Sequence, residues 1–398
     1  MPGALALLRD RPRFRALWAA LALSYTGSGA AITALTLYVQ QTRGTGAAVA
    51  ALLIAETGPR LLGPLAGSLA DRVDLRRMMI GADLGQMAFF ALLALLPPFG
   101  LLLALAALTA TLQCAYGPAR TAALPALVER DDLLQANSLT GLASNLYVAV
   151  GPLVGGLVFA AGGAAAVMAL NAFTFLGSAL LTRKLPPLPP EEREEGRERE
   201  PFLTSARTGL RYALSNPLTR TVTITIFFLF AFLAIDNVAL VFLVRDTLDG
   251  SAAAYGLVSA VFGVGMLVGS LSVMRGTRRS PAVLYLIALI FSSVGALLTG
   301  LAPVLAIVAL TQLVAGAGNA IEIVASDTIF QQDVPRSLIG RLYGLSSTAV
   351  AVGSGIAMAL GGFLVDATSP RVAFVVAGAG GLLTAAGAAP ALLRARST

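Results

Sequence analysis

The sequence predicts an all-α polytopic membrane protein with twelve transmembrane helices in two pseudo-symmetric halves of six. Three observations lead to this fold class. The 398-residue chain is 57% hydrophobic and only 12% charged, whereas soluble domains carry roughly 25% charged residues. Its apolar residues fall into runs close to the ~20 residues that a helix needs to cross a bilayer. A motif of small and charged residues at 63–77 recurs in degraded form at 265–279.

Twelve apolar runs are long enough to be spans. The first is of full spanning length and follows several arginines, without the short apolar region and cleavage site of a signal peptide. Cys114 is the only cysteine and histidine is absent, so we expect no disulfide, no metal site and no cofactor. The predicted spans are 15–40, 47–70, 78–96, 100–119, 138–161, 164–182, 221–244, 252–274, 281–300, 302–324, 342–365 and 371–393.

The basic residues predict the orientation, because Lys and Arg concentrate in cytoplasmic loops. With both termini in the cytoplasm, only Arg43, Arg60, Arg245 and Arg371 fall outside the cytoplasmic segments. The isoelectric point near 10.1 therefore reports orientation, since no basic face for nucleic acid exists outside these short loops. We expect a monomeric, multi-pass protein in the cytoplasmic membrane of a bacterium, with the lipid bilayer as its surroundings.

A polar segment divides the chain. Four prolines at 186–190 precede the charged run 191–200, which is too polar to enter a membrane. The expected domains are an N-terminal half at 1–183, a cytoplasmic linker at 184–220 and a C-terminal half at 221–398. Within the linker, residues 201–214 gather their apolar side chains on one helical face, which predicts an amphipathic helix along the membrane interface.

The repeated motif carries a family signature in its first copy. It resembles the glycine, Asp-Arg and Arg-Arg signature between the second and third spans of the major facilitator superfamily, although Asp74 stands where that family has glycine. The resemblance implies a charge cluster that latches the cytoplasmic side; the alternative is that these charges only anchor helix ends. The matching residues are Gly67, Asp71, Arg72, Arg76 and Arg77.

The fifth predicted span holds a second signature. Gly151, Pro152, Gly155 and Gly156 resemble the antiporter motif of drug–proton exchangers in this superfamily, although small residues at helical spacing also serve helix packing. Stretches at 119–128, 135–139 and 331–341 are similar to the macrolide-efflux and enterobactin-exporter group. The resemblance implies multidrug-type efflux of an amphipathic small molecule by alternating access, in exchange for protons.

Three carboxylates are expected inside spans, where an ionised side chain costs about 2.5–3.5 kcal/mol. They are Glu56, Asp236 and Glu322, while Asp83 and Asp327 are expected nearer the cytoplasmic edges. Because the chain has no histidine, any proton that is coupled to transport must be carried by a carboxylate.

Glu56 is the leading candidate for proton coupling because it lies near the middle of the second predicted span. Arg60 follows four residues later, so on a continuous helix the two would share a face. The pair could exchange a proton as water access alternates, or it could be a static ion pair that positions the spans. Asp236 and Glu322 are further proton or substrate candidates, and each could instead pair with a polar neighbour.

Aromatic and amide side chains within the spans are candidates for a substrate cavity, which would favour bulky, lipophilic cargo, cations included. Nucleotide-binding loops and catalytic constellations are missing from the sequence, so we expect no enzyme. Two alternatives stay open: a facilitator or exporter of a specific metabolite, siderophore or lipid without proton coupling, and a membrane sensor that does not transport. The cavity candidates are Tyr25, Asn145, Tyr147, Asn237 and Asn319.

Overall fold

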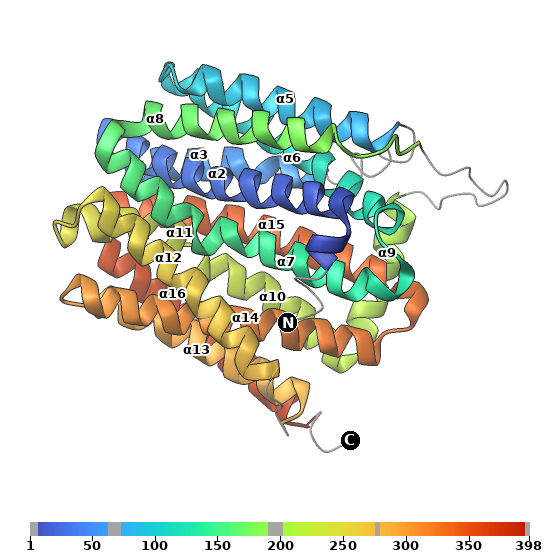
Figure 1. Ribbon diagram of the computed structural model, residues 1–398. Helices are drawn as coiled ribbons and strands as arrows, with labels where there is room; N and C mark the ends of the chain where they lie inside the picture. The colour runs from blue at the N-terminus through green and yellow to red at the C-terminus, as the bar shows by residue number, and fades with distance from the viewer. Residues whose placement is uncertain (1–6, 63–72, 190–201, 275–278, 395–398) are drawn as a thin grey trace. The chain divides into compact units, whose positions relative to one another are not determined.

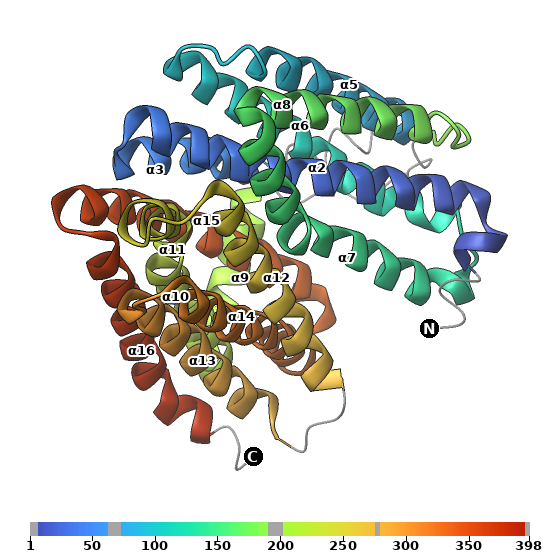
Figure 2. The ribbon, with the colours of Figure 1, turned by 60° about the vertical axis from the view of Figure 1, so that its left-hand side comes forward.

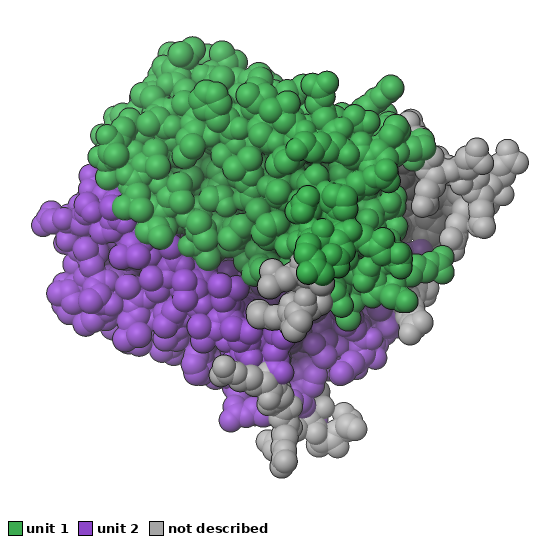
Figure 3. All heavy atoms as spheres, in the orientation of Figure 1, with its two compact units in different colours: residues 1–42, 52–193 green, residues 43–51, 194–398 purple. Residues whose placement is uncertain are grey.

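The computed structural model describes residues 7–62, 73–189, 202–274 and 279–394, and these residues form helices and no β-strand (Figure 1). The chain separates into two compact units, which are described one at a time. Unit 1 comprises residues 1–42 and 52–193, and unit 2 comprises residues 43–51 and 194–398 (Figure 3). The short segment 43–51 therefore groups with the second unit, whereas the sequence places it in the N-terminal half.

Unit 1 is built from helices, with one 3₁₀ turn after α3 and two between α6 and α7 in its described part. In chain order the elements are α2 (Pro12–Arg43), α3 (Gly46–Thr57), η1 (Gly58–Leu62), α5 (Leu75–Leu93), α6 (Phe99–Ala123), η2 (Leu124–Ala126), η3 (Arg130–Asp132), α7 (Leu133–Ala149) and α8 (Gly151–Thr182). The first residues of α3, up to Ala51, belong to unit 2.

After residues 43–51, the next described part of unit 2 is a short helix in the segment where an interfacial helix is predicted. Its elements are α9 (Phe202–Ser215), α10 (Pro217–Leu233), α11 (Asp236–Phe242), the π-helical turn η4 (Leu243–Thr247), α12 (Ala252–Met274), α13 (Pro281–Leu301), α14 (Leu305–Asp333), α15 (Arg336–Ala367) and α16 (Pro370–Arg394), several of which are seen along their axes in Figure 2.

Nine helical segments of the described chain are long and apolar enough to cross a membrane. One of them, 130–182, covers both the fifth and the sixth predicted spans. The second predicted span corresponds to α3 and η1, and its remainder, 63–70, lies outside the described residues. The third corresponds to α5, which has the length of a span but carries Arg76, Arg77 and Asp83. Each of the twelve predicted spans thus coincides with helix over most of its described length.

Three of the predicted spans are interrupted by breaks. The fifth bends at Val150, just before Gly151 and Pro152, because proline has no backbone N–H to continue the helix. The seventh is split between α10 and α11 at Ala234 and Ile235. The second turns from α-helix to 3₁₀ helix at Gly58, where Gly58 and Pro59 both disfavour an α-helix interior. Each of these breaks lies inside an apolar run that the sequence marks as one span.

The fifth and sixth spans meet at Gly163. This residue has φ 72° and ψ −174° within the segment that otherwise runs as α8. A positive φ with an extended ψ is open to glycine and costly for any residue with a Cβ. One glycine therefore ends the fifth span and starts the sixth without an intervening loop.

The two units share a packing pattern. In unit 1 the third predicted span, α5, packs against the fourth, α6, and the sixth, α8; in unit 2 the corresponding helix α13 packs against α14 and α16. Large apolar side chains such as Phe173 and Leu383 remain exposed on both units, as expected for helices whose outer faces meet lipid. These shared helix pairs are the structural counterpart of the repeat in the sequence.

Two of the arginines that depart from the charge rule donate to backbone carbonyl groups. Arg371 Nη1 donates to the carbonyl oxygens of Gly300 and Ala302 at 3.0 and 2.7 Å, at the C-terminal end of α13. Arg245 Nη1 donates to Gly250 O at 2.6 Å. A cation at a helix C-terminus satisfies carbonyl groups that have no partner in the helix. Capping of the C-terminal end of α13 thus explains the position of Arg371, whereas Arg245 binds a carbonyl of the loop before α12.

Candidate functional site

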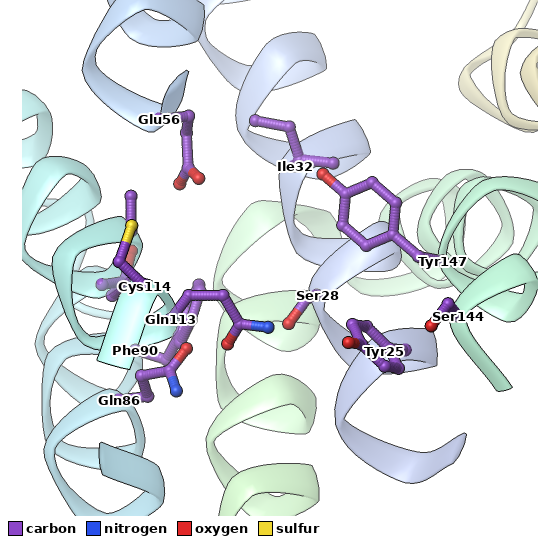
Figure 4. Close-up of a pocket in the computed structure, with 12 residues that line it drawn as sticks. Tyr25, Ser28, Ile32, Glu56, Gln86, Phe90, Gln113, Cys114, Ser144 and Tyr147 are labelled. Carbon is purple, nitrogen blue, oxygen red and sulfur yellow. The ribbon is translucent and has the colours of Figure 1, made fainter. Parts of the chain in front are cut away.

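Unit 1 encloses a half-open cavity of about 300 Å³ between its helices. Figure 4 shows polar side chains from several helices pointing toward this space. The lining combines one carboxylate with amides, hydroxyls and aromatic rings, a mixture that suits an amphipathic guest. The lining residues are Tyr25, Ser28, Ile32, Glu56, Gln86, Phe90, Thr109, Ala110, Gln113, Cys114, Ser144 and Tyr147.

Glu56 is the acidic residue of the cavity lining. It stands in the last turn of α3, and its carboxylate is directed into the cavity (Figure 4). Arg60 follows after the change to 3₁₀ helix, so the α-helical i,i+4 register that the sequence suggested is lost between them. The side chain of Arg60 lies outside what the structure describes, and the proposed ion pair stays a prediction.

Two predicted cavity residues lie in the same lining as Glu56. Tyr25 comes from α2 and Tyr147 from α7 (Figure 4). Asn145, two residues before Tyr147, does not belong to the lining of this cavity. Three sequence candidates from helices far apart in the chain are thus brought to one cavity.

Sequence reasoning missed the amides of this cavity. Gln86 on α5 is only 2% exposed, and its amide nitrogen has no hydrogen-bond partner among the described residues. Gln113 on α6 points into the same space (Figure 4). A buried amide nitrogen without a hydrogen-bond partner is costly. Polar residues at helical spacing, such as Thr109 with Gln113, were the signal that could have found this face.

Asp83 has a fully buried side chain, and its expected place nearer the cytoplasmic edge of the span stays a prediction. It lies on α5 and is 0% exposed. Ser178 Oγ of α8 donates to its Oδ2 at 2.7 Å, while Oδ1 is buried without a partner in the described part of the chain. Tertiary packing of α5 against α8 explains the burial, which a position within one helix could not reveal.

The candidate residues of unit 2 lie on α11 and α14. Asp236 opens α11, just after the break in the seventh span, and both of its oxygens accept from Gln312 Nε2 of α14 at 3.2 and 3.1 Å. Its neighbour Asn237 donates to Ala234 O at 3.2 Å. Half-helix ends within a span are where many transporters hold ions or polar substrate groups.

Glu322 is 2% exposed within α14. Tyr285 of α13 lies near enough to interact with it electrostatically, and Asn319 precedes it by about one turn of α14. The Tyr285 hydroxyl is buried and has no hydrogen-bond partner in the ranges that the structure covers. Glu322 thus occupies a packed interior position of unit 2.

The signature of the predicted latch is described only in part, because Gly67, Asp71 and Arg72 lie outside the described residues. Arg76 Nη2 donates to Arg183 O at 2.8 Å, after the end of α8. Asp74 caps α5 by accepting from the backbone N–H of Arg77 at 2.9 Å.

Asp74 also joins α5 to the segment that follows α8. Its Oδ2 accepts from Leu188 N at 2.8 Å, and Leu75 N donates to Leu188 O at 2.9 Å. A side-chain oxygen at the N-cap satisfies amides that have no partner in the helix. The departure from the family glycine thus has a clear local role.

The predicted antiporter motif forms a close helix contact within unit 1. A Cβ at Gly151 would lie 2.6 Å from Gly29 Cα, and one at Gly155 would lie 2.5 Å from Ala30 O of α2. Pro152 and Gly156 of the motif are buried as well. Such backbone-to-backbone approach requires residues without a side chain. Helix packing therefore accounts for these glycines, and their role in antiport stays a prediction.

The predicted cytoplasmic end of unit 1 holds a further charge cluster. Arg11 pairs with Glu129, and with Asp132 at 3.6 Å, and the hydrogen bond with Glu129 raises the pKa of Arg11.

No group of three or more His, Cys, Asp or Glu side chains placed to hold a metal ion occurs within the described ranges.

Comparison with known sequences gives a consistent result. The profile of the transmembrane secretion effector family matches residues 3–398. The enterobactin exporter EntS of Shigella boydii serotype 18 is 30% identical over 389 residues, which cover 95% of this chain and 91% of that protein. EntS of Escherichia coli O81 is 29% identical over the same length and with the same coverage.

Solved structures with a similar fold are also transporters. A mutant of the nucleoside transporter NupG has a TM-score of 0.80 at 14% identity, over 95% of this chain and 99% of that one. A bacterial homologue of the human lysosomal transporter Spinster, inward-facing and unoccupied, has a TM-score of 0.74 at 15% identity, over 97% and 99%. At these identities the likeness concerns the fold.

Proposed function

Because the chain belongs to the transmembrane secretion effector family of the major facilitator superfamily, we propose that it exports an amphipathic small molecule across the bacterial cytoplasmic membrane, in exchange for protons. The observation that carries the proposal is the cavity of unit 1, where Glu56 faces aromatic rings and amides. Apolar surface would hold the body of the cargo, while the amides and the carboxylate would orient its polar groups.

The energy for export would come from the proton gradient. One pH unit across the membrane supplies about 1.4 kcal/mol per proton, and 100 mV adds roughly 2.3 kcal/mol per charge. Glu56, Asp236 and Glu322 are the proposed coupling groups, since a carboxylate within a span is a functional candidate by default. Asp71, Arg72, Arg76 and Arg77, with Gly67, are proposed to form the cytoplasmic latch.

A second candidate function is favoured by the curated relatives. Both EntS proteins are named as enterobactin exporters, so this chain could export a siderophore, with or without proton coupling. The same cavity would serve either cargo, because its lining mixes aromatic rings with hydrogen-bonding groups.

The test uses the purified protein in proteoliposomes with a pH-sensitive dye inside. We expect an imposed proton gradient to drive uptake of a lipophilic drug-like cation, and cargo movement to change the internal pH in return. Enterobactin is tested in parallel. Export that continues unchanged when the gradient is collapsed would refute antiport. Transport of enterobactin alone would establish the second candidate.

A further inference from the structure

A groove on unit 1 combines arginine side chains with apolar ones. It has a volume of about 510 Å³ and lies between α5 and α8, two helices that run side by side in both ribbon views (Figures 1 and 2). The groove shares no lining residue with the cavity that contains Glu56. It is therefore a second candidate binding place of unit 1, separate from the one proposed for the cargo.

Contacts along α5 and α8 show that the two helices are antiparallel. Near the start of α5, Arg76 Nη2 donates to the backbone oxygen of Arg183, just after the end of α8, at 2.8 Å. Further along α5, the ring of Phe90 stacks on that of Phe175 of α8, with 5.6 Å between the ring centroids. Residue numbers thus rise along α5 while they fall along α8. The start of α5 and the end of α8 therefore lie at the same end of unit 1.

This end of the groove carries an excess of positive charge. Arg76, Arg77 and Arg183 line it together with one acidic residue, Asp74. The carboxylate of Asp74 already accepts two backbone N–H groups, from Arg77 at 2.9 Å and from Leu188 at 2.8 Å. Three guanidinium groups therefore stand against one carboxylate whose oxygens are both occupied.

Most of the hydrogen-bond donors of these arginines are unused. The side chains of Arg77 and Arg183 are exposed, and neither makes a hydrogen bond or ion pair to a described residue. Arg76 uses Nη2, but its Nε is buried without a partner in the described chain. A guanidinium group presents five N–H donors in a planar fork that fits a phosphate group. The arginine end of the groove thus offers what a phosphate needs.

Apolar side chains continue the groove away from the arginines. Ile80 and Leu84 lie about one and two turns into α5, and Leu180 and Leu176 lie about one and two turns before Arg183. Leu84 and Leu180 are 42% and 52% exposed. These parts of α5 and α8 belong to predicted spans, where exposed apolar side chains meet lipid hydrocarbon. The groove therefore passes from positive charge at the end of the spans to apolar surface within them.

The order of charge and apolar surface matches one kind of ligand. The distribution of Lys and Arg predicts that the start of α5 and the end of α8 lie at the cytoplasmic surface. That surface of a membrane is rich in anionic lipids, and basic pockets between transmembrane helices on this side hold their head groups. A phospholipid has its phosphate at the membrane surface and its acyl chains below, in the same order as the groove.

We propose that the groove between α5 and α8 binds one anionic phospholipid. The guanidinium groups of Arg77 and Arg183 hold the phosphate, and Arg76 adds a third positive charge. An acyl chain lies along the exposed side chains of Leu84 and Leu180. Lipid binding at this groove can be measured without any cargo, so it does not depend on the proposed export.

Quenching of tryptophan fluorescence by brominated lipids tests this site in the full-length protein. The chain has one tryptophan, Trp18, so Trp18→Phe with Leu180→Trp places the only fluorophore at the groove. The protein is reconstituted in phosphatidylcholine vesicles that contain an equal share of brominated phosphatidylglycerol or of brominated phosphatidylcholine. We expect brominated phosphatidylglycerol to quench more strongly. Equal quenching by the two lipids would overturn the proposed site.

A probe on another lipid-exposed face serves as the control for position. Leu383 of α16 in unit 2 is 74% exposed, so Leu383→Trp in the Trp18→Phe background reports the lipid that surrounds the protein in general. We expect it to show less preference for phosphatidylglycerol than Leu180→Trp. An equal preference at both probes would show that the anionic lipid is not gathered at the groove.

Removal of charge separates a site from general attraction to the membrane surface. With the Leu180→Trp probe, Arg77→Gln with Arg183→Gln should lower the preference for phosphatidylglycerol by about fivefold for each arginine, the effect expected of one arginine near a membrane surface. Arg13→Gln with Arg15→Gln removes the same charge from exposed positions of α2 on the same predicted side. Equal losses in the two double variants would leave only general attraction and refute the site.

Two further measurements identify the ligand. Arg77→Lys with Arg183→Lys keeps both charges and should retain part of the preference, whereas a preference as low as in the Gln double variant would show that charge does not select the lipid. Inorganic phosphate at the concentration of the brominated phosphatidylglycerol should leave the quenching unchanged. Loss of quenching would show that the groove binds the free anion, and a phospholipid would be refuted as its occupant.

Discussion

Unit 1 and unit 2 pack their helices alike but hold their polar groups differently. In unit 1, Glu56 faces an open cavity with Gln86 and Gln113. In unit 2, Asp236 is held by Gln312 and Glu322 is almost fully buried. Close helix packing constrains the backbone in both halves, because glycine contacts leave no room for a side chain. Polar positions are less constrained, so the two halves can have the same fold while their polar side chains serve different purposes.

The largest effect is expected at the cavity acid. Glu56→Gln keeps the shape of the side chain, but the amide cannot bind and release a proton as a carboxyl group does. Gradient-driven transport in proteoliposomes should therefore fall at least about tenfold, which corresponds to more than ~1.4 kcal/mol of lost coupling. Binding of cargo, measured by fluorescence, should change little. Asp249→Asn, in an exposed turn, is the control. Near-normal active transport in Glu56→Gln would remove this residue from the coupling mechanism.

The packing side of the comparison predicts equal effects in both units. Gly155→Val in unit 1 and Gly269→Val in unit 2 would each push a side chain against a facing backbone carbonyl, of Ala30 and Ala317 respectively. Each should destabilise the detergent-solubilised protein by about 1–3 kcal/mol, seen as a lower Tm. Gly141→Val, where no atom lies within 4 Å of a Cβ, should be tolerated. A strong effect in only one unit would show that the two units do not depend equally on these glycine contacts.

The proposed latch should be specific to the first half. Asp71→Asn is expected to slow turnover several-fold with little loss of cargo affinity, because a latch acts on the conformational step rather than on binding. The second copy has Val273 at this place and offers no equivalent change. Transport rates over a range of cargo concentrations separate the two effects, and a defect in affinity alone would contradict a gating role.

The smallest effects are expected at the caps of the third helix in each half. Asp74 accepts from Arg77 N and Leu188 N at 2.9 and 2.8 Å, so Asp74→Ala should cost about 1–2 kcal/mol. Ser280 caps α13 with one bond of 3.4 Å, from Val283 N, so Ser280→Ala should cost about 0.5 kcal/mol. Thermal unfolding of both variants gives the order, and a reversed order would show that the cap geometry does not govern stability.

Composition and hydropathy were sufficient to predict the helices of this fold. Apolar runs of bilayer length define spans almost without regard to tertiary context, which is why predicted and observed segments coincide. The interruptions could be foreseen only in part, although Pro152 was a signal for the bend in the fifth span. Gly58 and Pro59 were a readable signal for the end of α3, but no comparable signal precedes the break between α10 and α11.

The candidate site was predictable only in part. Glu56, Tyr25 and Tyr147 stand out from their sequence neighbours, and all three line the cavity. The burial of Asp83 depends on Ser178, which lies 95 residues away, and such long-range pairing cannot be read from a single helix. The sequence therefore shows which polar residues each span contains. Which side chains these residues contact depends on which helices pack together.

The joint at Gly163 has a practical consequence for mapping this protein. Because one residue with φ 72° replaces a loop there, an epitope tag, a protease site or a reporter fusion has no slack chain to enter. If a tag inserted at this turn gave no signal, the reason would be that the turn does not tolerate an insertion. The result would not show on which side of the membrane the turn lies. Labelling by a single substituted cysteine, in a background where Cys114 is replaced, is the appropriate way to locate this end of the two spans.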